Sequence, residues 1–246
     1  IRLSLVGSEM CIRDRAKDKL TVNPNPIRDT TTEFSTDTAE KVASLNPTQI
    51  IAVNSGLEDD KKALLEQIAP TTFHSDEYQD WQVPWDAQVK EISKAVDKED
   101  EGQKLIDDAE QAFEDFREAH PELQGKTAVI GMPYDGKFGV YTAGDGRGSF
   151  IEKLGFKIPE KFNGDGSSFF LDWSPENYAD FNDVDYLFVL DHYGAIDALK
   201  NDENFIDLDV SKRGGLYWLD TDTANAMSMP NPLSIPYAVE QIEEQL

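Results

Sequence analysis

Residues that commonly bind metals or carry out catalysis are scarce in this chain of 246 residues. Cysteine occurs once, at Cys11, which excludes an internal disulfide and a cysteine metal cluster. The three histidines, His74, His120 and His192, are too few and too scattered for the usual spacing of a zinc site. The sequence also contains no G-x-S-x-G elbow and no G-x-x-x-x-G-K-[ST] phosphate loop. We therefore expect no catalytic residues, no metal ligands and no cofactor.

Basic residues are also few, since 23 Lys and Arg face 48 Asp and Glu and leave a net charge of −25. This balance argues against nucleic acid as a partner, because phosphates require Lys and Arg, and against electrostatic docking on anionic lipid. The sequence has no run of 18 apolar residues that would predict a transmembrane helix. A hydrophobic content of 39% is typical of a globular protein, and the length suffices for one large domain or two small ones.

Residues 1–15, IRLSLVGSEMCIRDR, differ from the rest of the chain. They resemble a peptide that recurs at the ends of conceptual translations of environmental sequencing reads, where an adapter is read as coding sequence. The segment lacks the long apolar stretch and the small-residue cleavage site of a signal peptide. We expect it to be non-native, with the true N-terminus and any export signal missing. The alternative is a native strand near residues 3–6.

The first half of the chain predicts a βαβ unit followed by two helices. The pattern predicts a helix capped by Thr36 and Thr38, a strand at 49–53, a helix at 58–68 and a strand at 71–73. Ligands of such parallel sheets meet the loops that follow the strands, here residues 54–57. A helix at 86–96, an acidic break and a long helix at 99–120 come next. The long helix carries one apolar stripe, which consists of Leu105, Ile106, Ala109, Ala112, Phe113 and Phe116.

The second half, residues 126–246, again alternates strand and helix patterns. Strands are expected at 126–131, 138–141, 169–173, 185–190 and 215–220. Helices are expected to begin near Ser149 and at 174–176, and further helices are expected to span 195–200 and 235–245. A turn at 132–136 would present Tyr134. Two such regions on either side of a long helix predict an α/β fold of two lobes, with the helix as a strut.

Two features point to ligand binding. The glycine-rich turn at 144–149 places Arg147 at a helix start, where free backbone N–H groups and a guanidinium favour an anionic group. The alternative is a glycine turn with a surface arginine. Aromatic residues collect at expected loop ends, where they would stack on an organic ligand or pack against the core. These residues are Trp81, Trp85, Tyr134, Tyr141, Trp173 and Tyr193. Acidic pairs such as Asp220 with Asp222 lack calcium-loop spacing and suggest only a solvated face.

Five stretches together resemble the iron–siderophore substrate-binding proteins of ABC importers. They are AEKVASLNPTQIIAVNSGL, ALLEQIAPTTF, WDAQVKEISKAVDKEDEGQKLIDDAEQAFEDF, GDGRGSFIEKLGFKIPE and NPLSIPYAVEQIEEQL. The resemblance spans about residues 35–246. It implies two Rossmann-like lobes bridged by one long α-helix, with a ferric siderophore held in a ligand cleft between the lobes. The corresponding domains are a non-native segment at 1–15, an incomplete N-terminal lobe at 16–98, the interlobe helix at 99–122 and a C-terminal lobe at 123–246.

The same resemblance implies residue roles and partners. The ligand positions map onto Ser55, Gly56, Trp81, Tyr134, Arg147, Trp173 and Tyr193. Acidic residues at helix starts that dock on an ABC transporter permease map onto Glu58, Asp59 and Glu152. The protein would act as a monomer in the periplasm or, lipid-anchored, on the outer face of the membrane.

Two alternatives to this interpretation stay open. The same fold could bind haem, cobalamin or another metal chelate, although the scarcity of His and Cys counts against a bare metal ion. An α/β enzyme could instead use an Asp with His192 after the strand at 185–190, although no nucleophile or cofactor motif accompanies them. As written, the first lobe would lack part of its sheet, so we also expect lower thermal stability than in a version with a restored N-terminus.

Overall fold

The computed structural model describes residues 34–80, 82–165, 168–192, 194–228 and 230–246. The chain divides into two compact units, Ile1–Ile106 and Asp107–Leu246. The division falls inside helix α5 (Glu99–Ala119), so one continuous helix belongs to both units. Among the described residues, no helix is both long enough and apolar enough to cross a membrane.

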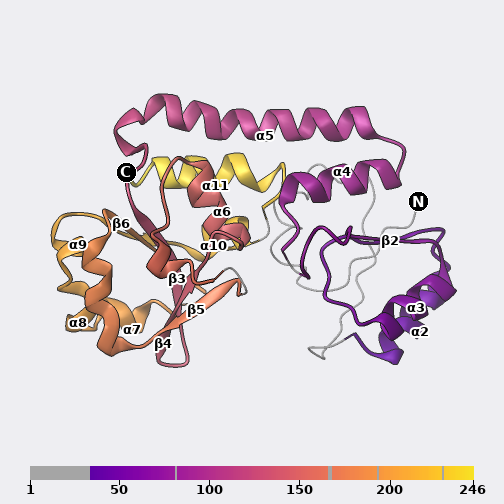
Figure 1. Ribbon diagram of the computed structural model, residues 1–246, viewed down its shortest axis with the longest axis horizontal. Helices are drawn as coiled ribbons and strands as arrows, with labels where there is room; N and C mark the ends of the chain where they lie inside the picture. The colour runs from indigo at the N-terminus through magenta and orange to yellow at the C-terminus, as the bar shows by residue number, and fades with distance from the viewer. Residues whose placement is uncertain (1–33, 81, 166–167, 193, 229) are drawn as a thin grey trace. The chain divides into compact units, whose positions relative to one another are not determined.

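The first unit contains the expected βαβ arrangement (Figure 1). Strand β1 pairs in parallel with β2, and Ile50 lies opposite Thr71. The element bounds are α2 (Thr36–Ser44), β1 (Ile50–Ala52), α3 (Asp59–Ile68), β2 (Thr71–Phe73) and α4 (Trp85–Ala95). The prediction that Thr36 and Thr38 cap this helix is wrong: the N-cap residue is Ser35, whose side chain accepts a hydrogen bond from the Thr38 backbone N–H. Ser35 has the extended backbone and side-chain oxygen that an N-cap requires.

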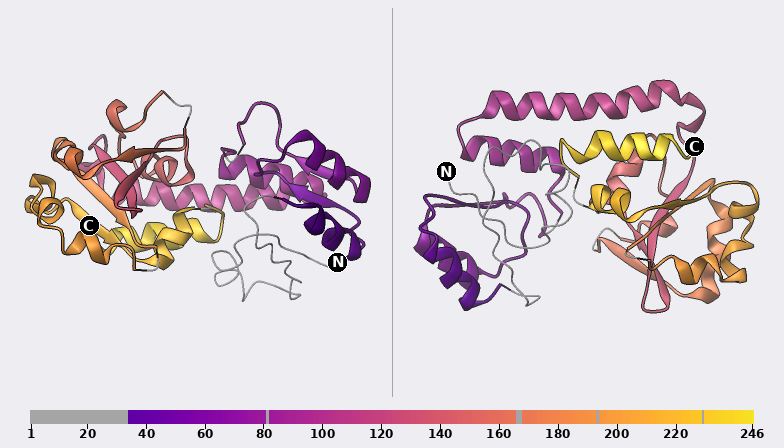
Figure 2. Two further views of the ribbon diagram at one scale, coloured as in Figure 1. Left: turned by 90° about the horizontal axis from the view of Figure 1, so that it is seen from below. Right: turned by 180° about the vertical axis from the view of Figure 1, so that it is seen from behind.

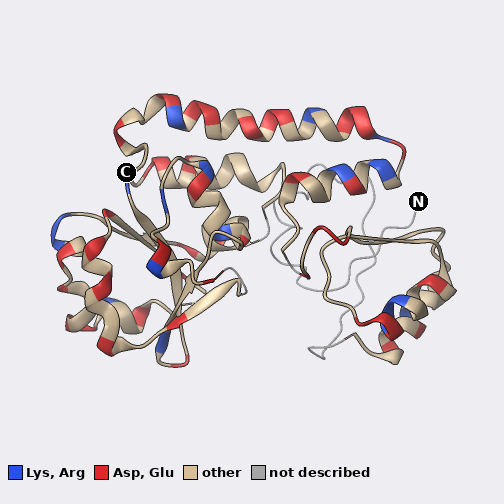
Figure 3. Ribbon diagram, in the orientation of Figure 1, with Lys and Arg blue, Asp and Glu red and all other residues tan. Residues whose placement is uncertain are grey.

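Helix α5 has 21 residues and therefore a length of about 32 Å at 1.5 Å per residue. Its buried stripe consists of Gly102, Ile106, Ala109, Phe113 and Phe116, at steps of three and four residues. The prediction that Leu105 belongs to this stripe is wrong, because Leu105 is 44% exposed. Figure 3 shows acidic residues along the length of this helix. A narrow buried stripe with a charged remainder is the pattern of a helix that rests on its neighbours.

Gly102, the first residue of the stripe, allows close contact between α5 and α4. A Cβ at this position would lie 2.4 Å from the Ser93 side chain, so α5 and α4 approach each other more closely than any larger residue permits. The N-terminal part of α5 is thereby fixed against α4 within the first unit.

The second unit is built on a five-stranded sheet in the order β5-β4-β3-β6-β7. Strands β3, β6 and β7 are parallel, whereas β4 pairs antiparallel with β3 and with β5. The strand bounds are β3 (Ala128–Tyr134), β4 (Lys137–Tyr141), β5 (Phe170–Trp173), β6 (Tyr186–Leu190) and β7 (Leu216–Leu219). The predicted strands are thus confirmed, and the sheet is mixed.

Two details of the predicted elements are corrected, and a third is made more specific. Strand β3 continues through Tyr134, and only Asp135 and Gly136 form the turn; both have positive φ, as a type I′ hairpin requires. Helix α6 starts at Gly146 and not near Ser149, because the Asp145 side chain accepts the Arg147 backbone N–H and caps the helix. The helix expected to begin at 174–176 is present as a 3-10 helix, η4 (Pro175–Asp183).

Helices pack on both faces of this sheet (Figure 1 and Figure 2). One face carries Val129, Phe138 and Val140 into a hydrophobic cluster with residues of η4 and the short helices that follow β6. On the other face α6 contacts β3, and Phe156 packs edge-on against Phe188 at 5.6 Å. The remaining helices are α6 (Gly146–Lys153), α7 (Asp197–Lys200), α8 (Glu203–Ile206), α9 (Asp209–Lys212), α10 (Thr221–Ser228), α11 (Ser234–Glu243) and the 3-10 helices η2 (Pro121–Leu123) and η3 (Glu160–Phe162).

Candidate functional site

Strand alternation brings several chemically distinctive side chains of the second unit to one face of the sheet. Phe138 and Val140 enter the hydrophobic cluster, so Lys137 and Tyr141 on the same strand point to the other face. The register places Tyr134 opposite Lys137 and Phe170 opposite Tyr141, and therefore on this second face as well. We call the surface formed by Met132, Tyr134, Tyr141 and Phe170 the aromatic face, although Met132 contributes a thioether and not a ring.

The rings of this face contact one another. Tyr134 lies edge-on to Phe170 at 6.1 Å between ring centroids, and the Tyr141 hydroxyl donates to the Met132 sulfur at 2.9 Å. Gly139 leaves room for the Tyr134 ring, since a Cβ there would lie 3.0 Å from the ring edge. Phe169, which is 41% exposed, packs on Phe170 at 4.7 Å and extends the apolar surface. The arrangement can pack against the flat or aliphatic arms of an organic ligand.

Arg147 lies at one end of the aromatic face. Its guanidinium carbon is 3.8 Å from the centroid of the Tyr141 ring, and its Nε donates to Asp145 Oδ1 at 2.9 Å. Stacking and the ion pair together hold the guanidinium in one orientation. Among the described residues, neither Nη1 nor Nη2 of Arg147 has a hydrogen-bond partner. The side chain keeps donors for an external oxygen while 17% of it remains exposed.

The start of α6 positions this arginine through a close backbone approach. A Cβ on Gly148 would lie 2.0 Å from the carbonyl oxygen of Thr142, so only glycine lets the first helical turn pack on the end of β4. Burial raises the pKa of the Asp145 carboxyl above its ordinary value of 3.8, although the neighbouring Arg147 charge opposes this shift. The helix cap and the ion pair depend on the same carboxyl group.

A second cation lies at the other end of the aromatic face. Lys137 donates to Asp172 Oδ2 at 2.7 Å, and the Tyr134 hydroxyl donates to the other oxygen of the same carboxylate. Asp172 lies opposite Gly139 on β5, so its side chain shares the face with Lys137 and Tyr134. The sheet register thus creates this three-residue network.

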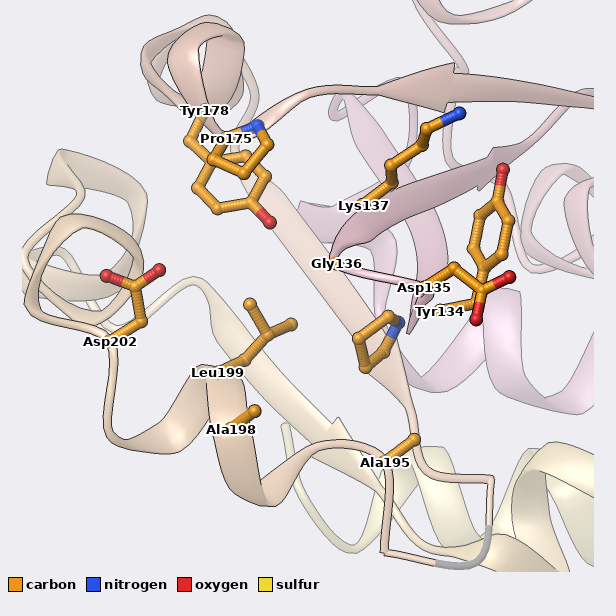
Figure 4. A pocket seen from close by; sticks show the side chains of 11 residues that line it. Tyr134, Asp135, Gly136, Lys137, Pro175, Tyr178, Ala195, Ala198, Leu199 and Asp202 are labelled. Atoms are coloured by element: carbon orange, nitrogen blue, oxygen red, sulfur yellow. The ribbon is translucent and has the colours of Figure 1, made fainter.

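A hollow of about 290 Å³ opens beside the β3–β4 hairpin. It is lined by the hairpin, by Pro175 and Tyr178 of η4 and by residues of the segment after β6, as Figure 4 shows. In this view Tyr134 and Lys137 lie at one side, and Tyr178 and Leu199 lie at the other. Its volume is at the lower limit of about 300–1,000 Å³ for small-molecule sites. We therefore place the candidate site on the aromatic face rather than in this hollow.

Comparison with known proteins identifies the family. The family model described as periplasmic binding protein matches residues 14–221, which is most of the chain. This chain is a member of the periplasmic binding protein family. Such proteins bind substrates for transport, so the match places the chain in a family of binding proteins rather than of enzymes.

Individual relatives agree with this assignment. The Fe(3+)-citrate-binding protein YfmC of Bacillus subtilis (strain 168) is 26% identical over 189 residues, which are 75% of this chain and 57% of that protein. The chain therefore spans less than two thirds of the length of this curated relative.

The iron uptake ABC transporter substrate-binding protein PiaA from Streptococcus pneumoniae TIGR4 is 26% identical, with a TM-score of 0.75 over 99% of this chain and 84% of that chain. PiaA in complex with ferrichrome is 27% identical, with a TM-score of 0.74 over 96% of this chain and 79% of that chain. The two-lobe α/β fold expected from the sequence is thereby confirmed, while the cleft between the lobes stays a prediction.

The predicted ligand residues of this periplasmic binding protein do not all come together in the second unit. Tyr134 and Arg147 share one face of the sheet, whereas Trp173 lies on the opposite face, where its ring contacts Phe162 at 4.9 Å. Ser55 and Gly56 belong to the first unit and follow β1, with the Ser55 hydroxyl donating to the Ala52 carbonyl at 2.9 Å. The roles of these residues stay predictions. Trp81 and Tyr193 lie outside the described residues.

The predicted permease-docking residues are exposed, but one is placed differently from the expectation. Glu58 precedes α3 as its N-cap residue and Asp59 is its first residue, as predicted. Glu152 is the penultimate residue of α6, so the expectation that it starts a helix is wrong. Partial burial of its carboxyl raises the pKa of Glu152, against a hydrogen bond from the Ile158 backbone. Docking by these three residues stays a prediction.

In the loop after β6, hydrogen bonds hold the Asp191 carboxylate in place. Asp191 Oδ1 accepts the backbone N–H groups of Gly194 and Ile196, and its Oδ2 accepts the Thr221 hydroxyl. Asp191 therefore stabilises the conformation of its own loop. Within the same described ranges, no cluster of three or more His, Cys, Asp or Glu could hold a metal ion.

The sequence reasoning missed Asp145, Asp172, Lys137 and Phe170 as members of the site. A signal existed for one of them: Lys137 alternates with the apolar Phe138 and Val140 after an Asp-Gly pair, which is the pattern of a hairpin strand. Asp172 and Phe170 become neighbours of these residues only through the register of β4 with β5.

Proposed function

We propose that this protein is an extracytoplasmic solute-binding protein that captures a ferric siderophore and delivers it to the permease of an ABC importer. Membership in the periplasmic binding protein family supports this function, as do the iron-related relatives YfmC and PiaA. The single structural observation that carries the proposal is Arg147, stacked on Tyr141 with donors left over at the end of an aromatic surface.

The chemistry of that surface suits a metal chelate. A siderophore presents oxygen atoms around the iron and organic arms outside it. Arg147 can donate to the oxygen atoms, and Tyr134 and Phe170 can pack on the arms. Because the siderophore supplies the ligands of the iron, the protein needs none of its own. The stacked and paired guanidinium loses little further conformational freedom when it binds.

Delivery to the permease forms the second part of the proposal. Glu58 and Asp59 at the start of α3 and Glu152 on α6 are exposed carboxylates, one group in each unit. Carboxylates of this kind can pair with arginines of a permease. The protein would work as a monomer in the periplasm or at the outer face of the membrane.

A fluorescence titration tests the capture step. Four tryptophans provide the signal, and the panel contains ferric hydroxamate, catecholate and carboxylate chelates. We expect saturable quenching by at least one ferric chelate, and none by iron-free siderophore or by simple ferric salts. The absence of any response across the three chelate classes would refute the proposed function.

Replacement of Arg147 tests the site itself. Arg147→Ala should weaken binding by about 1–3 kcal/mol, or about 5–150-fold, because it removes charge-assisted hydrogen bonds. The matched control is Lys212→Ala, which removes one exposed charge from α9, beneath the opposite face of the sheet. Thermal melts of both variants establish that they are folded. Unchanged affinity in a folded Arg147→Ala protein would remove this residue from the site.

A further inference from the structure

Both cations of the candidate site already have a carboxylate partner on the same face. Arg147 pairs with Asp145 at 2.9 Å, and Lys137 pairs with Asp172 at 2.7 Å. The basic groups at the two ends of the aromatic face are therefore compensated one for one. A ligand that approaches this face meets two ion pairs and the rings between them, with no net positive charge.

The Arg147–Asp145 pair is held in place by burial and by the helix cap. The side chains are 17% and 10% exposed, so solvent screens the pair weakly, and Asp145 also caps α6. The carboxylate cannot turn away when a ligand arrives without losing its bond to the Arg147 backbone N–H at 2.8 Å. An anionic ligand at Arg147 would consequently lie close to a fixed negative charge.

The Lys137–Asp172 pair is more exposed but has a third member. The Tyr134 hydroxyl donates to Asp172 and keeps the carboxylate beside the aromatic face. Repulsion from Asp172 would therefore meet an anionic ligand here as well. The chain as a whole carries a net charge of −25, which adds to the cost of bringing a second anion to the surface.

What remains between the ion pairs is apolar. Tyr134 and Phe170 present rings, and exposed Phe169 continues the surface. Tyr141 is buried beneath the Arg147 guanidinium, and its hydroxyl donates to the Met132 thioether. Such a surface gains from burying uncharged organic groups and gains nothing from ligand charge.

We propose that Asp145 and Asp172 set the charge class of the chelate, so that this face selects ferric chelates without net charge over anionic ones. The inference rests on the proposed function and names its substrate class. Three hydroxamates carry one negative charge each and neutralise ferric iron, which leaves a neutral complex. Three catecholates carry two charges each and leave a complex of −3, and ferric citrate is also anionic. The neutral tris-hydroxamate is the ligand that matches the compensated face.

The test compares three chelates on the intact chain and its variants. The chelates are ferrichrome, ferric citrate and a ferric tris-catecholate, each titrated by tryptophan fluorescence at low and high salt. For the unaltered protein we expect ferrichrome to bind at least tenfold more tightly than either anionic chelate, with little dependence on salt.

The variants Asp145→Asn and Asp172→Asn remove one charge each and keep the shape and the acceptor oxygen. Asparagine is as good an N-cap as aspartate, so α6 should stay in place. In each variant we expect the affinity for the anionic chelates to rise about tenfold, while the affinity for ferrichrome changes less than threefold. Asp207→Asn is the control, because it removes the same charge beyond α8, beneath the opposite face.

The outcomes separate this inference from the proposed function. Equal or tighter binding of an anionic chelate by the unaltered protein would overturn the inference and leave siderophore capture standing. The same holds if the asparagine variants, shown to be folded by circular dichroism, leave the ratio of affinities unchanged. Failure of all three chelates to bind would overturn the proposed function and the inference together.

Discussion

Phe113 should be the main anchor of helix α5 in the second unit. Its side chain is fully buried, and its ring meets Phe150 of α6 edge-on at 5.0 Å. The Lys153 ammonium lies 5.8 Å from the same ring and pairs with Glu110 one turn earlier on α5. The substitution Phe113→Ala would remove the contacts of this ring with α6 and leave a cavity between the two helices.

The expected loss of stability follows from the burial. Returning a fully buried phenylalanine side chain to water costs about 2–3 kcal/mol, and the unfilled cavity brings the total to about 3–5 kcal/mol. This loss is a large part of the roughly 5–15 kcal/mol by which a domain is stable, so the variant should fold but with little reserve. At a urea dependence of about 2–3 kcal/mol per molar, the unfolding midpoint should fall by about 1–2 M.

Phe169→Ala is the matched control, since it deletes the same ring from a site where the side chain is 41% exposed. Its cost should be about 1 kcal/mol, because only the contact with Phe170 and part of the burial are lost. Urea titrations followed by far-ultraviolet circular dichroism compare the two variants. Equal midpoints for both would refute the assignment of Phe113 as the anchor of α5.

Two further predictions concern α6 and the sheet. Gly148→Ala should destabilise the second unit by about 1–3 kcal/mol in a thermal melt and weaken chelate binding, because its Cβ would meet the Thr142 carbonyl at 2.0 Å; an unchanged melting temperature would contradict the close packing. Hydrogen bonds from the Thr127 backbone and side chain hold the pKa of Asp185 below its ordinary 3.8, so its charge stabilises the fold above that pH. The stability difference between the unaltered protein and Asp185→Asn should be constant near neutral pH and should shrink as the pH falls below about 3.8; a difference that persists in acid would contradict the assignment.

The sequence predicted most of the fold because its patterns are strong. Strand β2 has the predicted bounds, and α5 differs from prediction by one residue, since Pro121 and the acidic first turn mark its ends. The start of α6 was misplaced because the glycines at 144–148 suggest a loop, while the cap at Asp145 is a single residue. The Asp135-Gly136 pair is a strong signal for a two-residue hairpin turn, whereas the predicted turn spans residues 132–136.

The site was predictable only in part, and the reason is physical. Arg147 was identified from its place beside glycines at a helix start, and Tyr134 from its place at the end of a strand. Their carboxylate partners depend on the exact helix start and on the strand register. Asp145 reaches Arg147 only when the helix starts at Gly146, and Asp172 reaches Lys137 only in one register of β4 with β5. Periodicity indicates which residues face the core, but it does not indicate which strand lies alongside.

The double duty of Asp145 limits the ways in which related proteins could acquire a different ligand. Because its carboxyl both caps α6 and neutralises Arg147, a change to an apolar residue would lose the helix start together with the charge. Asparagine, serine and threonine are the replacements that keep a capping oxygen. Asp172 caps no helix, since it lies within β5, a strand at the edge of the sheet. On an evolutionary or engineered path toward anionic iron chelates, many different residues should therefore be tolerated at position 172 and very few at position 145.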